Sequence, residues 1–80
     1  MSLRQVEDLL NELIEQQNQK VLQCAAEILP NLTEDDLLQP NDFPQLENHP
    51  HFRYEEGVLS GLLTARTAFF ALRASLNKAP

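Results

Sequence analysis

The sequence predicts an all-α protein, an antiparallel helical hairpin of two long helices with a partly helical, proline-rich connector. Apolar residues recur at spacings of three and four in a segment near each end of the 80-residue chain, which is the period of one side of an α-helix. Four of the five prolines lie between these segments, from Pro30 to Pro50. All twelve acidic residues lie at or before Glu56, whereas the residues after it carry only basic charges. An antiparallel fold brings these opposite charges together.

The first helix is predicted over residues 3–29. Ser2 followed three residues later by Gln5 fits a capping box, in which each side chain accepts a hydrogen bond from a free backbone N–H. Pro30 ends the helix, because the residue before a proline is biased away from α geometry. The apolar stripe is interrupted at Gln17, inside a polar run of amide residues. Its members are Leu3, Val6, Leu10, Leu13, Val21, Cys24 and Ile28.

The connector spans residues 30–49 and is expected to contain folded structure. Thr33 followed by three acidic residues predicts a short helical turn at about 34–38, and Phe43–Pro44 is a weaker helix start. Several Leu and Phe residues provide apolar anchors, so we expect the connector to fold back over the end of the hairpin. The second long helix is predicted over residues 50–76, with Pro50 in the first position and Asn48 or His49 as its cap.

The second helix carries a large apolar face beside a nearly bare one. Val58, Ala65 and Leu76 mark the apolar face, and Gly57 and Gly61 lie on its small neighbour. A glycine inside a helix costs about 1 kcal/mol relative to alanine, so two of them predict a close contact with another helix. The predicted helix-packing interface comprises Gly57, Gly61, Leu62, Ala65, Ala68, Phe69 and Leu72, together with Leu10, Leu13 and Val21 of the first helix.

The charge distribution predicts the antiparallel orientation. Folding the chain near its middle places basic residues of the second helix beside acidic residues of the first. Exposed ion pairs are each worth less than about 1 kcal/mol, so burial of apolar side chains must hold the hairpin together. The predicted pairs join Arg66 to Glu12 or Glu15, and Arg73 to Glu7 or Asp8.

Both helices have more apolar surface than one seam between them can hide. Leu9 and Ile14 lie outside the main stripe of the first helix, and Leu59, Leu63 and Phe70 lie outside that of the second. The remainder must meet the connector, a second copy or another protein. We therefore predict a homodimer that forms a four-helix bundle, since symmetric pairs are the commonest oligomers, with a helical protein partner as the alternative.

One cluster of residue types suggests chemistry. His51 and Glu55 are four residues apart and share a helix face, a spacing that can hold a transition metal, with His49 as a further ligand. Cys24 is expected near the same end of the hairpin. A solvated helix start, with its acidic residues stabilised by the helix dipole, is the favoured explanation of these residues. The sequence therefore assigns no catalytic residue, cofactor or metal ligand, and a metal-dependent or thiol enzyme centred on these residues remains the alternative.

Two further features allow two interpretations each. Phe43, Phe52, Arg53 and Tyr54 are either a partner surface, since aromatics and Arg are common interface anchors, or a small satellite core beneath the connector. The amide of Gln17 either faces the seam and fixes the pairing of the helices, or marks a solvated bend.

Length and charge restrict the function. Eighty residues form one domain, and the net charge of −6 argues against nucleic acid as a partner. No apolar run reaches the ~20 residues of a membrane span, no secretory signal is visible, and the single cysteine fits a reducing compartment, so we expect a cytoplasmic protein. The leading hypothesis is a small non-enzymatic helical protein–protein interaction module, such as an adaptor, chaperone-like or assembly subunit. Besides the enzyme, the other alternative is a purely structural homodimer.

Overall fold

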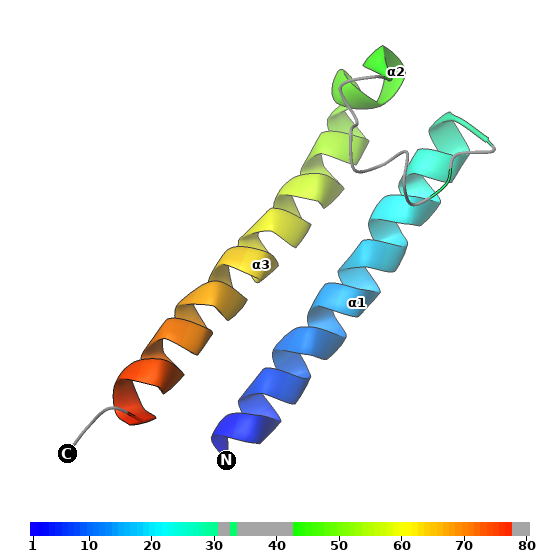
Figure 1. Ribbon diagram of the computed structural model, residues 1–80. Helices are drawn as coiled ribbons and strands as arrows, with labels where there is room; N and C mark the ends of the chain where they lie inside the picture. Colours follow the sequence, from blue (N-terminus) through cyan, green and yellow to red (C-terminus); the bar gives the residue numbers. More distant parts are fainter. Residues whose placement is uncertain (31–32, 34–42, 78–80) are drawn as a thin grey trace.

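The chain folds into a hairpin of two long antiparallel helices (Figure 1). A computed structural model describes residues 1–30, 33 and 43–77. Helix α1 spans Leu3–Ile28, the short α2 spans Pro44–Glu47, and α3 spans Pro50–Asn77. The molecule measures 52 × 20 × 20 Å, and no strand occurs in the described ranges. The predicted all-α class and the pairing of two long helices are confirmed, while the turn predicted at 34–38 lies outside the described residues.

The ends of the long helices follow from local hydrogen bonds. Ser2 Oγ accepts a bond from the Gln5 amide at 3.1 Å, and Gln5 Oε1 accepts one from the Ser2 amide at 2.8 Å, so the predicted capping box is present. Leu29 caps the other end of α1, where Pro30 prevents a further turn. At the start of α3, His49 Nδ1 accepts a bond from the Phe52 amide at 3.5 Å, as the capping prediction allowed.

The core lies at the connector end of the hairpin. Leu46 of α2 is 0% exposed and Phe52 of α3 is 1% exposed, and both pack against Val21, Cys24 and Ala25 of α1. Helix α2 thus anchors the end of the connector on the two long helices, as expected for a segment that folds back (Figure 1). Towards the opposite end, which we call the free end, several large apolar side chains are exposed: Met1, Leu3, Leu9, Leu72 and Leu76. Leu13 and Leu63 are exposed near the middle of the long helices.

The predicted apolar face of α3 coincides with the seam only in part. Val58, Leu62 and Phe69 are half-buried, whereas Leu72 is 57% exposed. Leu59, which was predicted outside the main stripe, packs against the core. The sequence of α3 is apolar on several faces, so its periodicity alone does not select one of them. Two arginines lie on the α1 side of the helix, and their polar ends find partners on α1.

Gln17 joins the two long helices through a buried hydrogen bond. The side chain is 6% exposed, and its Nε2 donates a hydrogen bond to the backbone carbonyl of Glu55 at 2.9 Å. The interpretation of Gln17 as a seam residue is therefore confirmed. A buried amide that finds its partner in only one alignment disfavours other alignments of the two helices.

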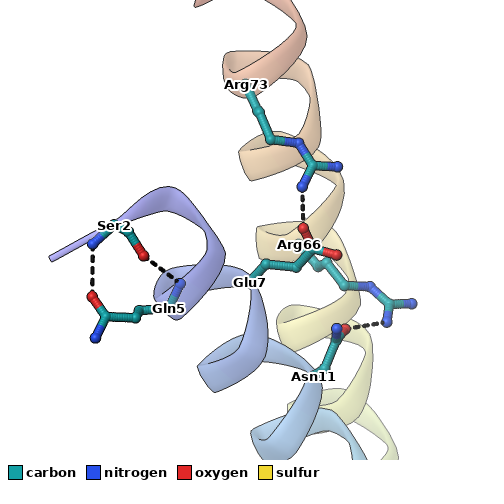
Figure 2. Close-up of polar contacts among 6 residues, drawn as sticks. All are labelled: Ser2, Gln5, Glu7, Asn11, Arg66 and Arg73. Carbon is teal, nitrogen blue, oxygen red and sulfur yellow. Dashed lines mark hydrogen bonds and ion pairs between the residues drawn. The ribbon is translucent and has the colours of Figure 1, made fainter.

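Polar contacts join the helices towards the free end (Figure 2). Arg73 forms an ion pair with Glu7, one of its two predicted partners, and its guanidinium lies 4.8 Å from the centre of the Phe70 ring. The predicted partners of Arg66 are wrong, because Arg66 Nη1 donates instead to Asn11 Oδ1 at 2.9 Å. The acidic residues predicted for it, Glu12 and Glu15, lie on exposed positions of α1.

Candidate interaction surface

Helix α3 presents a continuous stripe of small residues on the side opposite α1. Successive residues turn by about 100°, so a residue two positions after a seam residue lies about 200° around the helix. Seam residues Glu55, Leu59, Arg66 and Arg73 are each followed, two positions on, by a small exposed residue. We call this stripe the α3 outer face. It comprises Gly57, Gly61, Thr64, Ala68, Ala71 and Ser75, all exposed.

A shallow apolar hollow of about 420 Å³ lies along the middle of this face. Leu63 and Thr67 form one flank of it, and Thr64, Ala68 and Ala71 form its floor. The small floor residues leave room for the side chains or the backbone of another helix. A surface of this shape fits ridges-into-grooves packing of helices at short interaxial distance.

The α3 outer face carries no charge. Within the described part of α3 beyond Glu56, the only charged side chains are Arg66 and Arg73, and both reach towards α1 (Figure 2). Exposed helix faces of soluble proteins usually carry charged residues, and a helix that is apolar or small on all sides is typically buried. By this criterion α3 resembles a central helix, although α1 covers only one side of it.

The Cβ positions of the two glycines of α3 face open space in the part of the chain that the structure describes. A Cβ atom built on Gly57 or Gly61 would meet nothing within 4 Å. Each glycine costs about 1 kcal/mol of helix stability, and packing against α1 does not compensate for this loss. Contacts within the hairpin therefore do not account for these two residues.

The residues of the predicted helix-packing interface divide into two groups. Val21 is buried in the core, and Leu10, Leu62 and Phe69 are half-buried between the helices. The remaining members are exposed in the hairpin. These members are Gly57, Gly61, Ala65, Ala68, Leu72 and Leu13.

The aromatic cluster near the connector is mainly core. Phe52 is buried and Phe43 packs against the same cluster, as the satellite-core interpretation predicts, so Phe52 is not available to a partner. Tyr54 is 68% exposed, and Arg53 is exposed with its guanidinium paired to Glu56 at 2.9 Å. Only Arg53 and Tyr54 of the predicted partner surface lie fully on the outside.

The residues considered for catalysis line a second hollow, of about 220 Å³, between α1 and α3. Cys24, His51 and Glu55 lie around it with Lys20 and Glu27, whereas His49 is engaged in capping α3. Burial raises the pKa of the Cys24 thiol, and the negative charges of Glu27 and Glu55 raise it further. In the part of the chain that the structure describes, no three His, Cys, Asp or Glu side chains are placed to hold a metal ion.

Comparison with known proteins identifies no relative. The chain matches no protein-family model, no curated protein and no solved structure. Among the described residues, no helix combines the length and the apolar character needed to cross a membrane. The assignment of function therefore rests on the hairpin and its surfaces.

Proposed function

We propose that this chain is a small non-enzymatic helical protein–protein interaction module, and that the α3 outer face is its docking surface. The supporting observation is an uncharged, exposed helix face opposite α1, with an apolar hollow at its centre. Monomeric proteins rarely leave large contiguous apolar patches in water, and such patches mark interaction sites. The binding mode is packing of a helix into a groove, driven by burial of apolar surface.

The enzyme alternative has its best location at the hollow beside Cys24. A thiolate is the form of cysteine that attacks a substrate or binds a metal, and a raised pKa keeps the thiol protonated at neutral pH. The electrostatic environment of Cys24 is thus the opposite of that of an activated cysteine. This favours the interaction role over a thiol-based reaction.

A matched pair of charge substitutions tests the docking surface. Ala68→Arg places a cation on the α3 outer face, and Gln19→Arg places the same charge on an exposed position of α1. Tagged chains are used to capture partners from the native source, and the bound proteins, including untagged copies of the chain itself, are quantified by mass spectrometry. We expect a partner that the native chain and Gln19→Arg retain and Ala68→Arg loses. Equal capture by all three chains would refute the assignment of this face.

A further inference from the structure

The two long helices leave one side of their seam apolar and exposed towards the free end. On α3, a row of residues at alternating spacings of four and three begins with His51 and Glu55, which line the hollow beside Cys24. Residues at these spacings lie on one side of a helix, so the row stays on the side of the hairpin where the hollow lies. Its members beyond the hollow are Val58, Leu62, Ala65, Phe69, Leu72 and Leu76.

Helix α1 extends this surface across the seam. Lys20 lines the same hollow, and Leu13 and Leu9 precede it by seven and eleven residues, which again places them on one side of a helix. Leu9 is 49% exposed and Leu13 is 38% exposed, while Leu72 on α3 is 57% exposed. We call the combined surface the Leu9–Leu72 face. It comprises Leu9 and Leu13 of α1 and Leu62, Ala65, Phe69, Leu72 and Leu76 of α3.

Contacts between the helices place the two halves of this face side by side. Arg66 donates a hydrogen bond to Asn11, and Arg73 pairs with Glu7 (Figure 2). Leu9 lies midway between these two α1 residues, so it is level with the stretch of α3 between the two arginines. Asn11 and Leu9 differ by about 200° around the helix, so the polar contacts occupy one side of the seam and the leucines occupy the other.

The α1 edge of the Leu9–Leu72 face is acidic. Glu12 lies about 60° around the helix from Leu9, and Asp8 lies about one turn from Glu12 towards the free end. Both are exposed, and neither forms an ion pair within the described part of the chain. Glu12 accepts a hydrogen bond from the neutral amide of Gln16 at 3.3 Å. The α3 part of the face supplies no cation for these carboxylates, and Lys20 of α1 lies about 12 Å from Glu12 along the helix.

We propose that the Leu9–Leu72 face binds an amphipathic helix of another protein, with basic residues along the edge that meets α1. Apolar residues of such a helix, at spacings of three and four, lie over the seam between Leu9 and Leu72. Its Lys or Arg residues pair with Asp8 and Glu12, which selects a basic partner over a neutral or acidic one. A second copy of the chain carries a net charge of −6 and brings the same acidic edge. The Leu9–Leu72 face is separate from the α3 outer face, so this partner is additional to the one proposed above.

The test uses a synthetic peptide of about 14 residues, which matches the ~21 Å between Leu62 and Leu76 along α3. The peptide has Leu at helical spacings and Lys at the other positions, and a second peptide has Glu in place of each Lys. Binding to the purified full-length chain is followed by fluorescence anisotropy of the labelled peptides. We expect the Leu/Lys peptide to bind at least ~10-fold more tightly than the Leu/Glu peptide. No binding of the Leu/Lys peptide, or equal binding of both peptides, would overturn the inference.

Two matched pairs of exposed-site variants locate the bound peptide. Glu12→Lys and Glu47→Lys change the net charge equally, but Glu47 lies on α2 at the connector end, beyond the ~10 Å range of exposed charges in salt. Leu72→Ser and Leu63→Ser remove the same side chain, but Leu63 lies half a turn away around α3 and flanks the α3 outer face.

The two variants on the Leu9–Leu72 face should each weaken binding of the Leu/Lys peptide at least ~10-fold, and their controls less than ~3-fold. Far-UV circular dichroism first establishes that each variant retains the native helix content. Equal weakening within either pair would place the peptide elsewhere and overturn the inference.

A second copy of the chain is the competing occupant of this face. Sedimentation equilibrium of the native chain and Leu72→Ser over a dilution series detects it. A dimer that Leu72→Ser weakens and that the Leu/Lys peptide does not displace would overturn the inference. These measurements use no variant of the α3 outer face, so their outcome is distinguishable from failure of the capture experiment with Ala68→Arg.

Discussion

Truncation of Phe52 tests whether the small core at the connector end stabilises the hairpin. Phe52 is 1% exposed and packs with Leu46, Val21, Cys24 and Ala25. Replacing a buried Phe with Ala removes its burial and leaves a cavity, at a cost of about 3–5 kcal/mol. A domain of 80 residues has a total stability of about 4–12 kcal/mol. Phe52→Ala should therefore remove about a quarter or more of the free energy of unfolding.

The assay is urea unfolding followed by far-UV circular dichroism at one fixed protein concentration. Tyr54→Ala is the matched control, because Tyr54 lies two residues away on the same helix and is 68% exposed. Its substitution should change stability by no more than about 0.5 kcal/mol. Should Phe52→Ala fail to fold, Phe52→Leu should give a smaller loss in the same direction. Equal effects of Phe52→Ala and Tyr54→Ala would refute the location of the core.

Three further predictions concern single residues. Gln17→Leu should leave stability unchanged or raise it, because a buried apolar side chain replaces an amide while the Glu55 carbonyl can keep its hydrogen bond within α3. A loss of stability above about 2 kcal/mol in urea unfolding would contradict this prediction. Gly61→Ala, measured in the Ala68→Arg background, should raise stability by up to about 1 kcal/mol, since the added methyl meets nothing; a decrease would show a contact that the hairpin lacks. The pKa of Cys24 is raised in the folded chain, so the native chain holds its proton at pH values where the unfolded chain loses it. The contribution of Cys24 to stability is complete below the ordinary thiol pKa of 9.0 and is lost as the pH rises through the pKa of the folded chain. The free energy of unfolding of Cys24→Ala should therefore depend less on pH above 9.0 than that of the native chain.

The helix ends could be predicted from the sequence because each is decided by residues close to it in the chain. The capping box at Ser2 and Gln5, the stop at Pro30 and the start at Pro50 are each decided by the residues at the helix end, and the helix bounds agree within a residue or two. The antiparallel pairing was also predictable, because the acidic and basic ends of the two helices meet only in that direction. The pairing of Arg73 with Glu7 follows from this orientation.

The seam on α3 was harder to predict, for a physical reason. An arginine has a long apolar stem and a charged end, so it can lie beside a seam while its guanidinium reaches a polar partner. Arg66 and Arg73 do this with Asn11 and Glu7, and the pattern of apolar letters alone places such residues outside the seam. The informative signal was the absence of charge among the residues of α3 that lie two positions after the seam residues. The small residues Gly57 and Gly61 predicted a close contact with another helix, and α1 does not provide it.

The most direct measurement is hydroxyl-radical footprinting of the unmodified chain with and without the Leu/Lys peptide. Leu72 lies on the Leu9–Leu72 face and is 57% exposed, whereas Leu63 lies on the opposite side of α3 and is 37% exposed. If a basic amphipathic helix packs on the Leu9–Leu72 face, oxidation of Leu72 falls as the peptide is added and that of Leu63 does not change. Unchanged oxidation of Leu72, or an equal fall at both leucines, would contradict docking at this face.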